Sequence, residues 1–409
     1  MSRSPRLGAA LYETESSWGE NTSTFGTRLR TIGVLDCSKL EQQKLNPDRT
    51  VQFRNEITPG VNGIMGGEFT VRMTLTGHGA TTAGAISLSA LETLLGLVVG
   101  NVAAAGTNTT GAGTGTASAP GVAAASGGTA GALARFGALG DGRANGQFAA
   151  LSSHATSVMT LLTELPANMN NGDVVYNPAI VYPTELPTSN DITSTRWLLQ
   201  GANQEHEAHG CYPKRAVWSG FGPGEEPMVD ITFGTSWWKP VATSFPTATS
   251  VQTYAHAPVA AGSFFMADQG TATRSGATYN IRSFSLTIDL GIVELRGPGG
   301  VNASQVVTGC KRVPDRISGE FVVDAEDAAT APALGAKWLA NTPQHILYSW
   351  SVADTTAGAV YLPYVVPDGP RPTQFDLDGL NRTRFRFRAG TDASKSTALE
   401  RAAYRFASG

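Results

Sequence analysis

Apolar and polar side chains alternate in several separate runs of the chain, which predicts β-strands that bury one face and expose the other. The clearest run covers residues 68–76, where the apolar positions are Phe69, Val71, Met73 and Leu75. The same alternation recurs in residues 229–233, 283–290 and 382–388. Such strands are typical of antiparallel sheets with one solvated face. The predicted fold class is therefore mainly β with short helices, an α+β arrangement.

One strand pattern occurs twice. Residues 67–71 read Gly-Glu-Phe-Thr-Val, and residues 319–323 read Gly-Glu-Phe-Val-Val. Each copy precedes a segment with helical spacing of its apolar residues, at about 85–99 after the first copy and at 333–341 after the second. Further hairpin-like strands follow each helix. The pattern predicts an internal duplication larger than the five-residue core.

The duplication divides the chain into two predicted domains. A length of 409 residues suits two or three units. We expect a first domain at 1–238, a linker rich in Pro, Thr and Ala at 239–275, and a second domain at 276–409. Residues 101–147 consist largely of Ala, Gly and Thr. We expect this low-complexity insertion to have too few large side chains for a core and to form a long loop.

Composition favours assembly and argues against tight binding of nucleic acid. Charged residues make up 15% of the chain, where about 25% is usual, so the surface is poorly protected against association. The net charge of −3 has no clustered basic footprint. The cysteines are far apart and odd in number, which predicts reduced thiols rather than a disulfide framework; they are Cys37, Cys211 and Cys310. Neither an export signal nor a transmembrane segment is expected.

The segment 204–211 offers candidate metal ligands. His206, His209 and Cys211 stand beside Glu205 and Glu207, and a His-x-x-His spacing on a helix would bring two imidazoles together. The segment lies among strand signals, however, and on a strand the two histidines would face opposite sides. We favour ordinary hairpin residues and expect no metal site.

Other candidate chemistry has a simpler structural interpretation. Glu225 with Glu226, and Asp376 with Asp378, could form a catalytic carboxylate pair or could lie in solvated turns. Trp237 and Trp238 could form a sugar-binding platform, although paired tryptophans at a strand end more often pack in a core or an interface. The sequence contains neither a Gly-x-Ser-x-Gly motif nor a phosphate-binding loop. We therefore expect neither an enzyme nor a cofactor.

A row of arginines marks the C-terminal strand pattern. Arg384, Arg386 and Arg388 alternate with Phe385 and Phe387, which places the guanidinium groups on one strand face. This face could be merely solvated, could meet phosphates, or could form ion pairs with another protein subunit. We favour ion pairs between subunits.

Taken together, these segments resemble the major tail tube proteins of long-tailed, non-contractile bacteriophages. The resemblance rests on "LYETESSWGENT", on "ITPGVNGIMGGEFTVRMTLTGHG" followed by a helical pattern, and on two further segments. These are "GCYPKRAVWSGFGPGEEPMVDITFGT" and "SFSLTIDLGIVELRGPGG" with its continuation to residue 327. It covers most of the chain except 101–147, and the low-complexity insertion departs from the family pattern.

The resemblance implies a subunit of a hollow tail. Two β-sandwich or partial-barrel domains per chain, each with one helix, would complete a ring-shaped β-barrel as a trimer that acts as a pseudo-hexamer. Stacked rings would form a conduit for DNA, which would be bound only in transit. Further partners would be the tape measure, tail terminator and distal tail proteins, with no membrane. The protein would be made and assembled in the host cytoplasm and would reside in the virion tail.

The polar strand positions are then candidates for the wall of the conduit or for contacts between rings. These positions are Glu68, Thr70, Thr74, Glu320 and Asp324. Because bound phosphates would stall passage, we expect the arginine row to face protein. Two alternatives remain at this point. One is another β-rich virion component, such as a distal tail ring or a decoration protein. The other is a carbohydrate-binding or hydrolytic β-protein.

Overall fold

A computed structural model describes most of the strands that the sequence predicts. The described residues are 10–19, 31–32, 35–45, 61–74, 100–104, 106–123, 129–137, 147–155, 157–162, 168–183, 192–200, 205–222, 224–241, 261–268, 277–279, 281–298, 305–324, 330–353, 356–369, 373–377 and 380–408, with a few single positions. The predicted helix at about 85–99 lies outside them, apart from Gly96 and Val98, which are helical. The predicted helix at 333–341 is observed as α2 (Thr330–Leu339).

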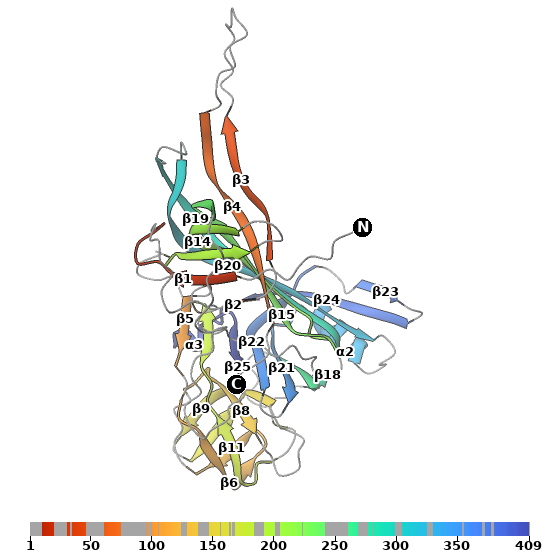
Figure 1. Ribbon diagram of the computed structural model, residues 1–409. Coiled ribbons are helices and arrows are strands. Elements are labelled where there is room, and N and C mark those ends of the chain that lie inside the picture. The colour runs from red at the N-terminus through yellow and green to blue at the C-terminus, as the bar shows by residue number, and fades with distance from the viewer. Residues whose placement is uncertain are drawn as a thin grey trace, which may run out of the picture.

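The centre of the molecule is a run of antiparallel neighbours that we call the main sheet (Figure 1). In spatial order its strands are β3 (Leu35–Leu45), β4 (Val61–Thr74), β15 (Met228–Thr235), β14 (Glu205–Ser219), β19 (Ile281–Pro298), β20 (Gln305–Asp324), β24 (Leu380–Gly390) and β23 (Thr373–Leu377). Strands β3 and β23 form its two ends. Hairpins β3–β4 and β19–β20 extend away from the body in the same general direction.

Both copies of the Gly-Glu-Phe pattern are strands of the main sheet. Phe69 in β4 and Phe321 in β20 are buried, as period-two alternation requires. Each phenylalanine stacks on a cross-strand partner, Phe233 in β15 or Phe385 in β24, with ring centroids 5.3 Å and 5.1 Å apart respectively. The two copies therefore share strand position, burial and an aromatic cross-strand pair, which stabilises a sheet beyond simple burial.

Direct pairing of β14 with β19 joins the two predicted halves of the chain. Arg215 pairs with Asp289 and Trp218 with Leu286. The strands of the two predicted domains thus belong to one continuous sheet. The division into two tube-like domains stays a prediction.

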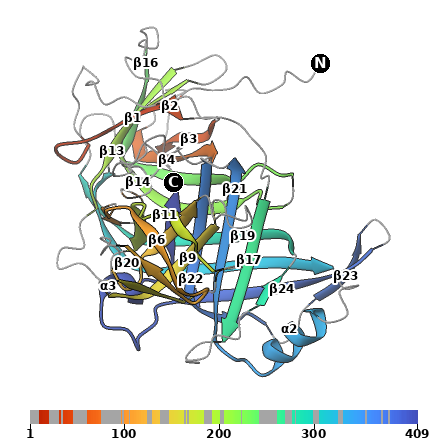
Figure 2. The same cartoon turned by 90° about the horizontal axis from the view of Figure 1, so that it is seen from below.

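Two further layers of strands cover the apolar face of the main sheet. One consists of β18 (Ala277–Tyr279), β17 (Ala261–Asp268), β21 (Gln344–Ala353), β22 (Thr356–Pro367), β25 (Arg405–Ser408), β12 (Ile180–Pro183) and β5 (Gly100–Ala103). The other joins β2 (Thr31–Ile32), β1 (Ala10–Thr14), β13 (Thr195–Gln200), the start of β14 and β16 (Trp237–Val241). Helix α2 packs Trp338 against Phe321 and Phe385, and the short α3 (Ala398–Arg401) precedes β25. Figure 2 shows α2 beside β17 and β24.

Part of the range assigned to a linker is a core strand. Residues 261–268 form β17, which pairs with β21 along its whole length. Phe264 and Met266 on this strand are buried. Their neighbours Phe265 and Ala267 are buried on the other face against the barrel cluster. The strand therefore shows no alternation of apolar and polar residues, and the Pro, Thr and Ala content of the surrounding segment obscured it.

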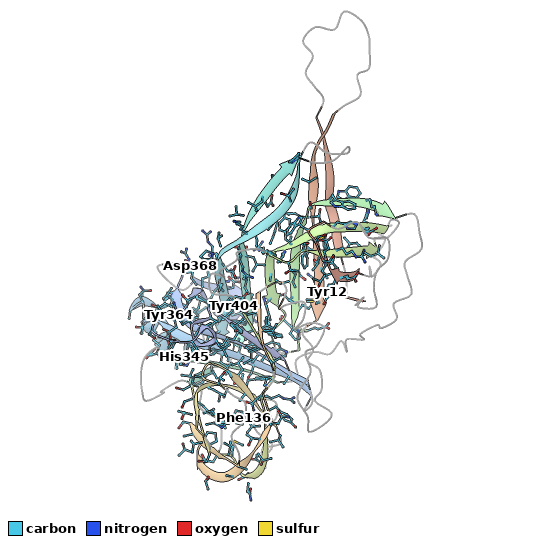
Figure 3. All side chains as sticks on the ribbon, turned by 90° about the vertical axis from the view of Figure 1, so that its left-hand side faces the viewer. Tyr12, Phe136, His345, Tyr364, Asp368 and Tyr404 are labelled. Carbon is cyan, nitrogen blue, oxygen red and sulfur yellow. The ribbon has the colours of Figure 1, made fainter. Side chains whose placement is uncertain are left out.

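The low-complexity segment contributes to a closed barrel, so the expectation of a loop without a core is wrong for its described part. The barrel strands are β6 (Thr109–Thr116), β7 (Ala119–Val122), β8 (Leu133–Gly137), β9 (Gln147–Ala155), β10 (Val158–Leu161) and β11 (Asn171–Tyr176). Larger side chains fill it, including Phe136, Phe148, Leu151 and Met159, and Figure 3 shows Phe136 inside. Small residues suit the narrow β6–β7 turn, where a Cβ on Gly115 would lie 2.2 Å from the Ala119 carbonyl oxygen.

The barrel is an insertion whose two ends lie side by side. It is flanked in sequence by β5 and β12, which pair with each other through Ala103 and Ile180. The barrel packs on the outer face of the layer that contains β17, β21 and β22. Phe265, Leu347 and Tyr361 of these strands join its apolar cluster. The chain is mainly β with short helices, as predicted.

A polar sheet face as the candidate functional site

The polar face of the main sheet brings together residues from both halves of the chain. Because directly paired residues of antiparallel strands face the same side, one face carries a set of mostly polar positions, interrupted by Val217 and Val322. We call this set the mixed-charge face. It comprises Glu68, Thr70, Arg72, Arg215, Asp230, Thr232, Ser285, Thr287, Asp289, Ser318, Glu320, Arg384, Arg386 and Arg388.

Cross-strand contacts tie β4 and β15 together on this face. Arg72 donates two hydrogen bonds to the Asp230 carboxylate, both of 2.7 Å. This hydrogen bond to Asp230 raises the pKa of Arg72 above its ordinary value, although partial burial acts in the opposite direction. Two residues along each strand, on the same face, the hydroxyl groups of Thr70 and Thr232 lie 3.1 Å apart. The face is polar here but its charges are paired.

Ion pairs continue across the joint between the halves. The Arg215 guanidinium lies 3.2 Å from the Asp289 carboxylate, directly across the β14–β19 joint. Lys214 lies 3.0 Å from Glu68 and 3.1 Å from Glu294. Burial lowers the pKa of Lys214, but hydrogen bonds to Glu68 and Glu294 outweigh it and the pKa is raised. The lysine is therefore held in its charged form.

The arginine row shares this face with the acidic candidates. Glu320 lies between Arg384 and Arg386, at 3.8 Å and 3.6 Å, and Arg388 lies 2.9 Å from Asp368. Glu320, a candidate for the conduit wall or for contacts between rings, is the cross-strand partner of Arg386 and so lies on the same sheet face as the arginine row. Arg386 and Arg388 keep 60% and 66% of their side-chain surface exposed. Ion pairs from these arginines to another chain stay a prediction.

Two predicted polar positions are placed only by their backbone. Thr74 pairs with Met228 at the end of β4, and Asp324 pairs with Arg382 at the end of β20. Their side chains lie outside the described residues. Arg72, Asp230, Arg215 and Asp289 were not candidates, because alternation shows which face a residue takes but not which residue stands across from it.

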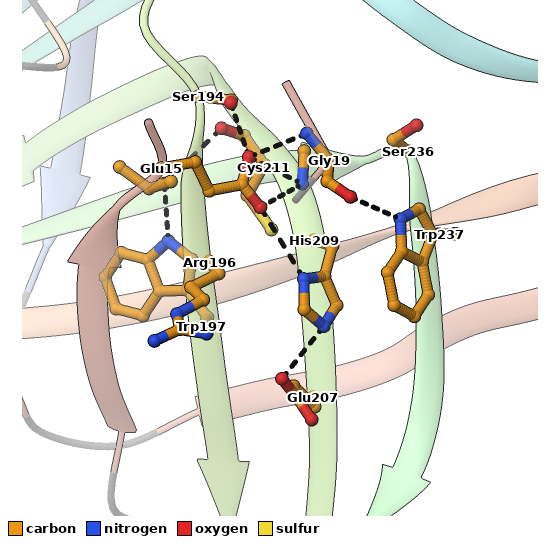
Figure 4. Close-up of polar contacts among 12 residues, drawn as sticks. Glu15, Gly19, Ser194, Arg196, Trp197, Glu207, His209, Cys211, Ser236 and Trp237 are labelled. Atoms are coloured by element: carbon orange, nitrogen blue, oxygen red, sulfur yellow. Dashed lines mark hydrogen bonds and ion pairs between the residues drawn. The ribbon is translucent and has the colours of Figure 1, made fainter. Parts of the chain in front are cut away.

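The histidine segment forms a buried polar cluster (Figure 4). His209 Nε2 lies 2.9 Å from Glu207 Oε1, and His209 Nδ1 lies 3.6 Å from Glu15 Oε1. The imidazole stacks on the Trp237 indole with a centroid distance of 3.8 Å. His206 instead meets Trp238 edge-on. The two histidines thus contact neighbouring tryptophans on opposite sides of the strand, as a strand requires.

Glu15 is the residue of this cluster that the sequence analysis missed. Its carboxylate accepts hydrogen bonds from the Ser194 hydroxyl and from the backbone N–H groups of Gly19 and Gly210. Burial raises the pKa of Glu207, but hydrogen bonds from His209 and Lys239 lower it below its ordinary value. The Ser194 hydroxyl is thus engaged with the Glu15 carboxylate. Its geometry ties β1 and the residues after it to β14.

The remaining candidates occupy structural positions. Glu225 accepts a hydrogen bond from the Gly222 N–H within the β14–β15 turn, and Asp376 lies in β23 while Asp378 is outside the described residues. Cys211 and Cys310 are free and buried, and burial raises the pKa of the Cys310 thiol to about 12. Cys37 has no described side chain. Over the part of the chain that the structure describes, no cluster of His, Cys, Asp and Glu has metal-site geometry.

No family model matches this chain, and no curated protein matches it. None of the helices in the described ranges has both the length and the apolar character to cross a membrane.

Proposed function

We propose that this protein is a structural virion component, the subunit of a hollow tail tube that stacks as rings and conducts DNA into a host cell. The observation that carries the proposal is the architecture of the main sheet. It contains two matching strand arrangements, and both of its ends, β3 and β23, have a single strand partner among the described residues. Exposed edges are an aggregation liability unless a neighbour pairs with them.

A ring of such sheets removes the liability. Head-to-tail contacts that close by rotation generate rings, and closure of a sheet into a barrel leaves no free edge. Three duplicated chains would supply six equivalent positions around the axis. The tube would act passively, without catalysis or cofactor.

The mixed-charge face supports the conduit role. DNA binds through contacts of Lys and Arg to its phosphates, and affinity rises with the number of such contacts. In the described part of this face, acidic partners accompany Arg72, Arg215, Arg384, Arg386 and Arg388. We propose that this face lines the lumen, with the arginine row included. The row was expected to face protein because bare guanidinium groups would hold phosphates, but Glu320 and Asp368 accompany it. Such paired charges would keep the wall hydrated without retaining the passing DNA.

Negative-stain electron microscopy of the concentrated protein tests the proposal. Hollow rings or tubes whose end-on views contain three chains and six similar lobes are expected. Rings of six whole chains would retain the structural role but contradict the two-domain interpretation. A protein that stays monomeric at every concentration would favour a decoration protein. Binding or cleavage of glycans in a parallel screen would favour the carbohydrate-directed alternative.

A further inference from the structure

The two halves of the main sheet correspond residue by residue. Gly67 and Gly319 begin the repeated pattern, and Val71 and Val323 end it. Val71 pairs with Ile231 in β15, and Ile231 pairs in turn with Ala216 in β14. In the second half, Val323 pairs with Thr383 in β24, and Thr383 pairs with Gln374 in β23. By this register β23 occupies in the second half the position that β14 occupies in the first.

The other side of the repeated strand gives a matching correspondence. Gly319 pairs with Leu286 in β19, and Gly67 pairs with Leu40 in β3. Ile317, two residues before Gly319, pairs with Ile288, and the equivalent Met65 pairs with Gln42. Strand β3 therefore corresponds to β19.

Among the described residues, one joint links these two kinds of strand. In the β14–β19 joint, Trp218 pairs with Leu286, Val217 with Thr287 and Ala216 with Ile288. The equivalent strands β23 and β3 lie at opposite ends of the main sheet, so they cannot pair within one chain. Figure 2 shows β23 at the rim of the molecule. Each has one strand partner among the described residues.

We propose that β23 of one copy pairs in antiparallel fashion with β3 of the next copy, in the register of the internal β14–β19 joint. The inferred partners are Asp376 with Leu40, Phe375 with Glu41, and Gln374 with Gln42. The partner is a second copy of this chain because the internal joint already shows that the two strand types fit. The inference rests on the proposed function in one respect, which is that identical chains assemble with one another.

Disulfide trapping between two proteins that each carry one introduced cysteine tests the register. One protein carries Phe375→Cys and the other Glu41→Cys, both in a Cys37→Ser background that keeps the buried Cys211 and Cys310. A second mixture uses Gln374→Cys with Gln42→Cys, because adjacent pairs alternate between close and wide side-chain spacing. The off-register control mixes Phe375→Cys with Leu45→Cys, whose Cα atoms would stand about 13 Å apart, beyond disulfide reach.

On mild oxidation at least one in-register mixture should give cross-linked dimers. Their yield should exceed that of the off-register mixture by about tenfold or more, because disulfide formation needs Cα atoms within about 7 Å. Each protein alone should not cross-link. A protein with both substitutions of one in-register pair should give a ladder that ends at three chains.

Microscopy of the same samples separates this inference from the proposed function. Rings that form without in-register cross-links, or with better off-register ones, would overturn the register and leave the tube proposal standing. In-register cross-links in samples that never form hollow rings would support the strand pairing and contradict the tube. Monomers that never cross-link would contradict both.

Discussion

Gly319 occupies a position in β20 where a side chain has no room. A Cβ there would lie 2.3 Å from Phe387 Cζ and 2.6 Å from the Ser285 carbonyl oxygen, so the aromatic ring packs directly on the backbone. We expect Gly319→Ala to lower the free energy of unfolding by about 1–3 kcal/mol, as overpacked cores do. The measurement is urea unfolding followed by tryptophan fluorescence.

Gly335 provides the matched control. It lies inside α2, and no atom stands within 4 Å of where its Cβ would be. Gly335→Ala should raise stability by about 0.5–1 kcal/mol, because alanine is the better helix former. Equal changes in the free energy of unfolding for the two substitutions would show that the close packing at Gly319 does not contribute to stability.

Glu294 makes stability depend on pH. Burial raises its pKa, but hydrogen bonds from Tyr212, Lys214 and Arg296 bring it below the ordinary value of 4.5. A carboxyl group with a lowered folded-state pKa stabilises the fold at pH values above its ordinary pKa. This contribution disappears as the pH falls through the folded-state pKa.

Glu294→Gln should therefore be less stable than the wild type at neutral pH, by about 1 kcal/mol. The difference should shrink as the solution is acidified below the carboxyl pKa. Chemical unfolding at a series of pH values measures it. A difference that stays constant from about pH 7 to about pH 3 would contradict the assigned role of the carboxylate.

At the scale of elements, Glu15 anchors the first strand. Its buried carboxylate satisfies the Ser194 hydroxyl and two backbone N–H groups. Glu15→Ala would leave these donors and His209 without it, and we expect a loss of about 3 kcal/mol. Thr14→Ala, at an exposed position of β1, should change stability by less than about 0.5 kcal/mol. Thermal unfolding measures the stability. Limited proteolysis measures how readily the chain is cleaved next to β1 (Ala10–Thr14).

The inserted barrel should be separable from the main sheet. Because Ala103 and Ile180 are cross-strand partners, a short Gly-containing turn can replace the residues between them. The shortened chain should retain its β-sheet circular dichroism but should lose solubility, since Phe265, Leu347 and Tyr361 would be uncovered. Phe265→Thr and Leu347→Thr in the shortened chain should restore solubility. An unfolded product in both cases would show that the main sheet depends on the barrel.

The sequence predicted the positions of single strands more readily than it predicted which strands pair with one another. Alternation around Phe69 predicted that strand and its buried face, and the repeat predicted an equivalent strand around Phe321. It could not show that Arg215 stands opposite Asp289, because pairing between distant segments leaves no local pattern. The barrel was missed for a related reason. Its large core residues, such as Phe148 and Met159, follow the low-complexity segment, which contributes mainly small residues to the same core.

For the whole molecule, hydrogen exchange should distinguish free from assembled chains. Outward-facing amides of β3 and β23 should exchange rapidly in the monomer, since each strand has one partner in the described ranges. Assembly should slow them by the amount expected for paired strands. Amides at the β14–β19 joint should be protected in both states. Protection of the joint alone, in assembled samples, would contradict closure through the sheet ends.

The joint between β14 and β19 also affects the protein concentration at which a ring can form. Because both strands belong to one chain, their meeting is a unimolecular event, governed by an effective concentration rather than by the amount of protein present. In a proposed ring of three chains, half of the junctions would form during folding. Only the other half would pay the translational and rotational entropy of association. Tube growth should then show a lower critical concentration than the same six lobes supplied as separate chains.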